Sequence, residues 1–148
     1  MKIQIHCGID PGQSGSIACI PNNDPSKAWA IKMPETLGDL WAHISELSKL
    51  EHEAVAYLES VHSMPGQGVS SSFKFGRGFG TLEMALTAAG IRFEYVTPQK
   101  WQKALGCLTK GDKNVSKAKA QQLFPHLKIT HAIADGLLIA EYCRRASI

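Results

Sequence analysis

Apolar and polar side chains alternate along the first ten residues of the chain. The apolar side of this alternation consists of Ile3, Ile5, Cys7 and Ile9. A period of two is typical of a β-strand with one buried face, and Asp10 ends the opposite face. A proline and two glycines follow within five residues, so residues 16–20 are predicted to double back as the second strand of a hairpin. Asp10 would then lie near the hairpin tip.

Residues 54–58 form a short apolar run without alternation. Five residues are too few for an amphipathic helix, so the run favours a central strand that is buried on both faces. Glu59 is the last residue of this strand. If the strand lies parallel to the first, at a spacing of roughly 4.8 Å, Asp10 and Glu59 emerge side by side at one edge of the sheet.

A third segment, near the end of the chain, has the period of a helix. Its two stripes are Ile133, Leu137 and Ala140, and Asp135, Ile139 and Tyr142. Asp135 is the only acid in the first two turns of this helix.

Asp10, Glu59 and Asp135 are thus three separated carboxylates in or beside apolar sequence. Isolated buried carboxylates are costly, and two of them about 4 Å apart repel by about 4 kcal/mol at an effective dielectric constant near 20. Three converging acids would therefore shift their pKa values or share a divalent cation. Ligands that are all oxygen favour magnesium or manganese over zinc.

Each acid also has an ordinary structural interpretation. An Asp before Pro-Gly is a common turn former, a Glu that ends a strand is often solvated, and a lone Asp in a helix can be half of a salt bridge. The three acids in this order are more specific than any one of them.

Weaker patterns predict the remaining elements. Strands are expected at residues 27–33 and 91–96, and helices at residues 37–50, 81–89 and 113–124, with a further helix opening at Pro98. Thr36 and Thr97 are expected to cap two of these helices, and Trp101 to be a core anchor.

Several blocks of the sequence resemble one known family. GIDPG on the first strand, a Glu that ends a later strand and ADGLLIAEY on the last helix are similar to the RuvC-type Holliday junction resolvases of the RNase H-like superfamily. MPGQGVSSSFKFGRGFG and TPQKWQKALG resemble the phage-type members in particular. The resemblance runs from Ile3 to about Tyr142. It implies an α/β fold with a five-stranded mixed sheet flanked by helices.

The resemblance also implies a site. Asp10, Glu59 and Asp135 match the acidic metal ligands of the family. Many relatives carry an acid or His about one turn before the last Asp; here the residue three back is Ala132, and His131 is four back and shares a helix face with Asp135. His131 is therefore the candidate for this position, either as a metal ligand or as a proton-transfer group.

A mechanism follows from these assignments. Two Mg²⁺ ions about 4 Å apart, with Mn²⁺ as a substitute, would activate water for in-line hydrolysis of a phosphodiester, and the family implies 5′-phosphate products. Symmetric paired nicking of a four-way junction needs two active sites related by a two-fold axis, so the expected partners are junction or other branched DNA and a second copy of the chain.

The formal net charge of +3 hides an asymmetry. Residues 1–96 hold 7 Lys and Arg against 10 Asp and Glu, a balance of −3, whereas residues 97–148 hold 9 against 3, a balance of +6. A basic surface of this kind is typical of proteins that contact phosphates, although lysines also favour any solvated helix face. Lys113 and Lys117 are the preferred pair for contacting DNA, because their segment resembles the basic stretch that leads into a late helix of the family.

Residues 63–80 hold five glycines and four serines, with Phe73, Lys74 and Arg77 among them. We expect a long loop here, because this composition is unusual for an ordinary connection. Interleaved aromatic and cationic side chains can stack on exposed bases while contacting phosphates, and Phe73 is the preferred wedge. Phe79 is expected to pack inward.

Length and composition agree with one domain over residues 1–148, since 44% of the residues are hydrophobic and no repeat or low-complexity tract is present. The four cysteines lack metal-ligand spacing and are interpreted as reduced, small hydrophobic residues. No stretch resembles a signal peptide or a membrane span, so we expect a cytoplasmic protein of a bacterial or phage-infected cell.

Three alternatives remain. The chain could be a broader nuclease that cuts flaps and other branched DNA, or a protein of this fold that binds junctions without cutting them. GIDPGQSG also resembles the first phosphate-binding hairpin of actin-like kinases and ATPases, but these need two such lobes and 148 residues provide one.

Overall fold

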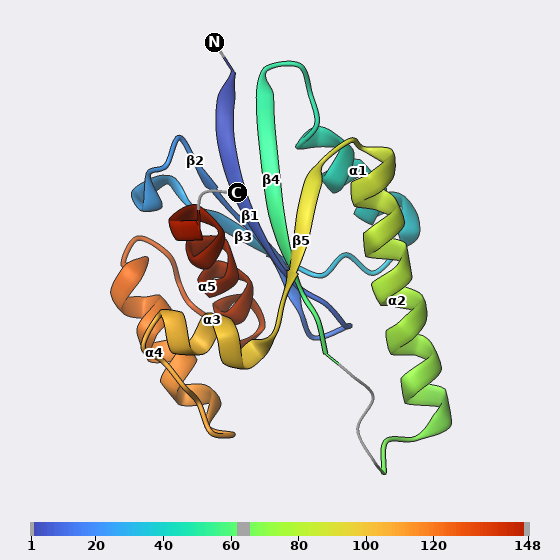
Figure 1. The fold of residues 1–148 in the computed structure, drawn as a ribbon, viewed down its shortest axis with the longest axis vertical. Helices are drawn as coiled ribbons and strands as arrows, with labels where there is room; N and C mark the ends of the chain where they lie inside the picture. The colour runs from blue at the N-terminus through green and yellow to red at the C-terminus, as the bar shows by residue number, and fades with distance from the viewer. Residues whose placement is uncertain (1, 62–65, 147–148) are drawn as a thin grey trace.

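Five strands form one mixed sheet in a computed structural model that describes residues 2–61 and 66–146 (Figure 1). In chain order the strands are β1 (Ile3–Asp10), β2 (Ser16–Pro21), β3 (Trp29–Lys32), β4 (His52–Glu59) and β5 (Arg92–Val96). The spatial order is β3-β2-β1-β4-β5; β2 is antiparallel to both of its neighbours, and β4 is parallel to β1 and β5. The predicted hairpin, the central buried strand and the edge strand over 91–96 are therefore confirmed.

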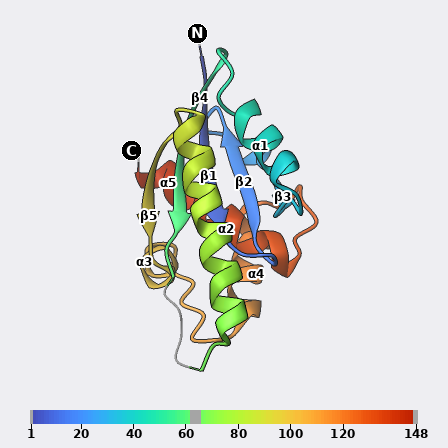
Figure 2. The same cartoon turned by 90° about the vertical axis from the view of Figure 1, so that its right-hand side faces the viewer.

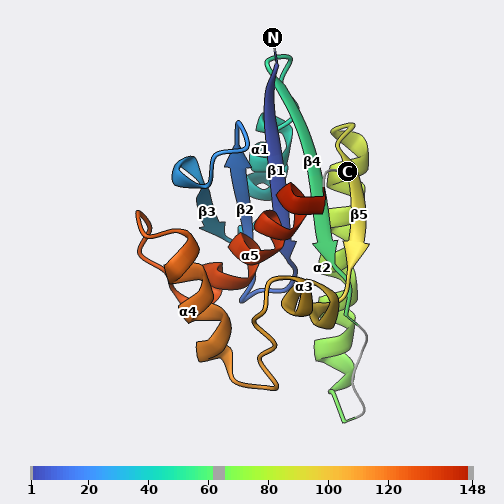
Figure 3. The same ribbon diagram turned by 60° about the vertical axis from the view of Figure 1, so that its left-hand side comes forward.

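Helices cover both faces of this sheet. The helices are α1 (Leu37–Glu46), α2 (Val69–Ala88), α3 (Pro98–Ala104), α4 (Lys113–Leu123) and α5 (His131–Ala146), with a short 3-10 helix at Pro25–Lys27. Helices α1 and α2 lie on one face, as Figure 2 shows, and α5 crosses the other face with α3 and α4 beside it, as Figure 3 shows. This confirms the α/β fold with a five-stranded mixed sheet flanked by helices that the family resemblance implied.

The alternation along β1 divides the core in two. Ile5, Cys7 and Ile9 pack on the side of α1 and α2, whereas Tyr57 and other residues of the opposite face pack against α5. All four cysteines are buried and free, as their interpretation as small hydrophobic residues predicted.

Two helix starts follow from capping side chains that the sequence analysis identified. The Thr36 hydroxyl accepts a hydrogen bond from the backbone N–H of Asp39, and the Thr97 hydroxyl accepts one from Lys100, with Pro98 at the first position of α3. Helix α1 ends at Glu46, four residues earlier than predicted, and residues 25–27 form a 3-10 turn, so that β3 begins at Trp29.

The prediction of a long loop over residues 63–80 is wrong from Val69 onward, because α2 begins at that residue. Phe73, Lys74 and Arg77 therefore project from a helix; residues 63–65 of the predicted loop lie outside the described residues. Glycine content suggested a loop, but the buried Leu82 and Leu86 anchor the same helix against the sheet. This tertiary packing overrides the weak helix propensity of the glycines before it.

Helix α5 approaches β1 unusually closely, and two glycines permit this. A Cβ atom added at Gly8 would lie 2.1 Å from the backbone nitrogen of Ala140 and 2.4 Å from the carbonyl oxygen of Gly136. A Cβ atom at Gly136 would lie 2.2 Å from the Ser16 hydroxyl oxygen on β2. At Gly8 the added atom would meet helix backbone, so no side chain larger than hydrogen fits there without moving the helix away from the sheet, whereas at Gly136 the first atom met is a side-chain hydroxyl.

We expect Gly8→Ala to lower the free energy of unfolding by about 3 kcal/mol, because the methyl group must displace backbone atoms of α5. Urea denaturation measures this change. Gly38→Ala is the matched control, since an added Cβ there meets nothing within 4 Å. An equally small effect of the two substitutions would contradict the close packing of α5 on β1.

Candidate active site

Two carboxylates stand at the ends of neighbouring parallel strands. Asp10 ends β1 and Glu59 ends β4, and the pairing of Ile9 with Leu58 sets the two acids side by side, as parallel pairing predicted. Their side chains hydrogen-bond to each other. Glu59 is buried, with 7% of its surface exposed.

Asp135 joins this pair from the second turn of α5. The helix crosses β1 at Gly8, two residues before Asp10, and Gly136 at the contact follows Asp135 directly. The close packing of helix and strand therefore brings the third carboxylate to the end of β1. The Asp135 charge acts on both other acids.

Burial removes all three acids from water and thereby disfavours their charged forms. Burial, followed by the negative charges of Glu59 and Asp135, raises the pKa of Asp10 to about 8. Burial is also the largest cause that raises the pKa of Glu59 and of Asp135. Near neutral pH, the group lacks the positive charge that would keep all three acids ionised.

Three polar contacts partly offset this cost. The indole Nε1 of Trp101 donates a 2.7 Å hydrogen bond to Oε2 of Glu59, and the buried Ser116 hydrogen-bonds to Asp135. The ammonium of Lys113 lowers the pKa of both Asp10 and Asp135, so it lies within reach of the site. Sequence reasoning placed Trp101 in the core and did not identify Ser116, because neither contact leaves a periodic signal along the chain.

His131 and Lys117 stand further from the acids. His131 is the exposed first residue of α5; its charge lowers the pKa of Asp135 only. Lys117 is half-buried, one turn beyond Lys113 on α4. Neither residue makes a hydrogen bond or ion pair to the three acids among the described residues.

A groove of about 870 Å³ begins at the turn that follows Asp10. It runs between the β1–β2 turn, the segment before α1 and the first half of α2, and Lys74, Phe75 and Arg77 line it. Phe73 is outside this lining and is 70% exposed. Phe79 stacks on Phe75 and Tyr95, in agreement with its predicted inward packing.

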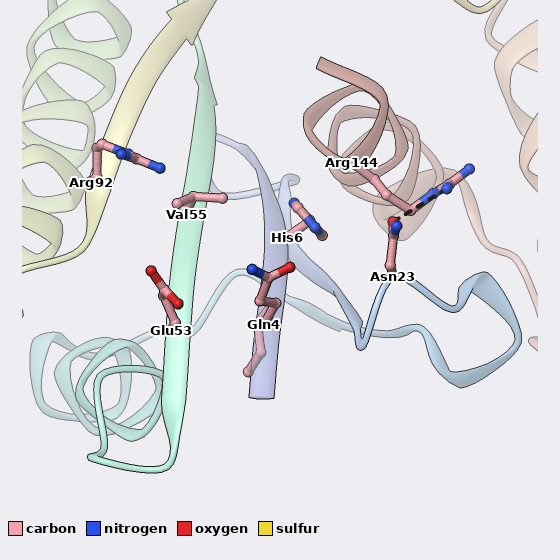
Figure 4. Close-up of a pocket in the computed structure, with 8 residues that line it drawn as sticks. Gln4, His6, Asn23, Glu53, Val55, Arg92 and Arg144 are labelled. Carbon is pink, nitrogen blue, oxygen red and sulfur yellow. Dashed lines mark hydrogen bonds between the residues drawn. The ribbon is translucent and has the colours of Figure 1, made fainter. Parts of the chain in front are cut away.

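A second cavity, of about 210 Å³, lies at the opposite end of β1 (Figure 4). Gln4, His6 and Glu53 come from the sheet, while Arg92 on β5 and Arg144 on α5 line the cavity on either side. Charges of both signs line this cavity, and none of the three candidate acids does. It therefore forms no part of the candidate site.

The donor set fits a divalent cation in its chemistry. Asp10, Glu59 and Asp135 offer only carboxylate oxygens, which hard cations such as Mg²⁺ prefer. In residues 2–61 and 66–146, no three His, Cys, Asp or Glu side chains are already arranged as metal ligands. A bound cation would supply the positive charge whose lack, together with burial, raises the pKa of Asp10 beside Glu59 and Asp135.

The fold is that of the RNase H-like α/β class. Its solved neighbours include RuvC of Thermus thermophilus in complex with a Holliday junction substrate, at a TM-score of 0.64 and 18% identity over 99% of this chain and 96% of that chain. A second structure of Thermus thermophilus RuvC matches with a TM-score of 0.62 and 18% identity over 93% and 90% of the two chains. No family model and no curated protein sequence matches the chain. The chain therefore has a RuvC-like fold.

Among the helices of residues 2–61 and 66–146, none combines the length and the apolar character needed to cross a membrane.

We expect Asp10→Asn to stabilise the metal-free protein increasingly as pH rises. The folded protein keeps a proton on Asp10 up to about pH 8, whereas the unfolded chain releases it near pH 4, so folding takes up a proton in this interval. Wild-type stability should therefore fall between pH 4 and pH 8, by an amount on the order of a few kcal/mol, and this fall should shrink in the variant.

Chemical denaturation in EDTA at several pH values measures this difference. Glu51→Gln, which changes an exposed acid between α1 and β4, is the control and should keep the wild-type pH dependence. Parallel pH profiles of the wild type and Asp10→Asn would contradict the coupling of the buried acids.

Proposed function

We propose that this protein is a metal-dependent endonuclease that hydrolyses phosphodiester bonds in four-way DNA junctions. The observation that carries the proposal is the carboxylate group at the ends of β1 and β4, where the half-buried Asp10 and the buried Glu59 lie side by side and the charge of Asp135 on α5 acts on both. Structural similarity to RuvC over nearly the whole chain supports the choice of a branched DNA substrate.

Divalent cations, Mg²⁺ or Mn²⁺, would supply the Lewis acidity for attack of water on the phosphate. Asp10, Glu59 and Asp135 would hold these cations. Lys113, whose charge already reaches two of these acids, contacts the phosphate and stabilises its charge. His131, one turn before Asp135, acts as a further ligand or moves a proton.

The surface on either side of the carboxylates suits a DNA duplex. In Figure 1 the ends of β1 and β4 lie between the first turns of α2 and the helices α3 and α4. Lys74 and Arg77 line the groove on the α2 side, and Lys113 and Lys117 lie on α4. The ring of Phe73 on α2 is 70% exposed, which supports its proposed role of stacking on a base at an opened junction centre.

Paired nicking requires a homodimer, and α2 offers a surface for it. Gly76, Gly80 and Met84 follow one another at four-residue spacing; Cβ atoms at the two glycines would meet nothing within 4 Å, and Met84 is 63% exposed. An apolar hollow of about 420 Å³ adjoins this stripe, between α2 and Trp41 of α1. A second copy of the chain would cover these apolar groups and place two active sites on one junction.

The proposal predicts that the protein nicks a synthetic four-way junction symmetrically in Mg²⁺, leaving 5′ phosphates. EDTA should abolish this cleavage, and Asp10→Asn should reduce it by several orders of magnitude while junction binding remains. The measurement is cleavage of a labelled four-way junction, a flap and a linear duplex, side by side.

Each other outcome has its own meaning. Equal cutting of flap and junction would make the protein a general nuclease of branched DNA. Tight junction binding without cutting in either Mg²⁺ or Mn²⁺ would overturn the catalytic proposal and leave a junction-binding protein.

We also expect Lys74→Ala and Arg77→Ala to weaken junction binding and to lower the slope of log affinity against log salt by about 1 each, because each variant releases one counterion fewer on binding. Fluorescence anisotropy at several salt concentrations gives the slope. Lys49→Ala is the control, since Lys49 pairs with Glu46 on α1. Unchanged slopes would remove the groove from the DNA interface.

A further inference from the structure

Trp101 is a buried indole whose only polar atom faces a candidate metal ligand. The side chain has no exposed surface, and Nε1 donates to Oε2 of Glu59 at 2.7 Å. An indole carries one donor and no acceptor, so this hydrogen bond uses its entire polar capacity. A buried N–H without an acceptor costs free energy, so the indole is held to the one acceptor it has, which is Oε2 of Glu59.

The topology makes this contact rigid. Val96, the last residue of β5, pairs with Glu59, and the backbone N–H of Ser60 donates to the carbonyl of Val96 at 2.8 Å. Helix α3 begins two residues later, with Thr97 as its cap. Trp101 therefore sits one helical turn beyond the strand that pairs with Glu59, and it reaches back to that carboxylate without a flexible loop between the two.

The chemistry of an indole also suits this position. A Lys or Arg beside Glu59 would supply a positive charge that competes with a bound cation, whereas a neutral N–H orients the carboxylate and leaves its negative charge available. Ser116 is a second uncharged side chain beside a candidate ligand: it lowers the pKa of Asp135, while its hydroxyl donates to the carbonyl of Lys113 at 3.1 Å. Two of the three candidate ligands thus have a buried, uncharged hydrogen-bond partner.

We propose that Trp101 is a positioning residue for the active site: its N–H holds Oε2 of Glu59 so that Oε1 is directed toward the metal ion. This inference rests on the proposed function. It goes beyond that function because it assigns to a core side chain an effect on metal affinity and on the rate of hydrolysis.

The test compares Trp101→Phe, which removes the N–H and keeps most of the ring, with Trp29→Phe on the opposite edge of the sheet. Calorimetric titration of the DNA-free protein with Mn²⁺ gives metal affinity, and cleavage of a four-way junction gives kcat and KM. We expect Trp101→Phe to lower metal affinity by about 10–100-fold and to lower kcat with little change in the KM for DNA. Trp29→Phe should match the wild type in each measurement.

A second variant separates positioning from packing. 3-Benzothienylalanine, placed at position 101 alone, keeps the shape of the indole and replaces N–H with sulfur. We expect it to melt like the wild type and yet to lose the same metal affinity as Trp101→Phe. Wild-type metal affinity and kcat in this variant would overturn the positioning role, and would leave the proposed nuclease function intact.

A metal-free readout distinguishes failure of this inference from failure of the proposed function. The indole ¹H–¹⁵N resonance of Trp101 should exchange slowly with solvent, and Glu59→Ala should shift it and speed its exchange. A wild-type protein that shows this behaviour but binds no Mn²⁺ and cuts no junction would overturn both the nuclease function and the positioning role. An indole resonance that is insensitive to Glu59→Ala would overturn the positioning role alone.

Discussion

The contact between α5 and β1 is the constraint on which the rest of the molecule depends. Gly8 and Gly136 let a helix backbone rest almost directly on a strand, and both glycines stand within two residues of a candidate acid. The same contact covers the half of the core on the α5 side of the sheet and positions Asp135 beside the end of β1. The same close contact holds the fold together and positions Asp135. A substitution that moves α5 away from β1 would therefore also displace this carboxylate.

The three carboxylates of the site lower the stability of the folded protein. Three carboxylates in low-dielectric surroundings repel one another, and Lys113 together with a few neutral donors compensates only part of that repulsion. Such an arrangement persists because strands and helix, each anchored elsewhere, hold the acids in place. A structure selected for stability alone would carry amides or apolar groups at these three positions.

The sequence predicted the elements whose signals are local. Alternation identified β1, the short apolar run identified β4 with Glu59 at its end, and Thr36 and Thr97 marked two helix starts. It failed at the beginning of α2, where Gly76 and Gly78 suggested a loop, because the packing that holds this helix comes from residues further along and from the sheet. The bond from Trp101 to Glu59 joins residues 42 positions apart, and no one-dimensional pattern reports such a contact.

The length of α2 has a consequence for any assembly of two chains. The helix runs without interruption over 20 residues, which corresponds to about 30 Å. Its first turns carry Lys74 beside the groove, and its later turns carry Met84 on the apolar stripe. A straight helix of this length would set a fixed spacing: if two copies packed through one end of α2, the distance between their two carboxylate groups would be fixed, and a bend in the helix would change it.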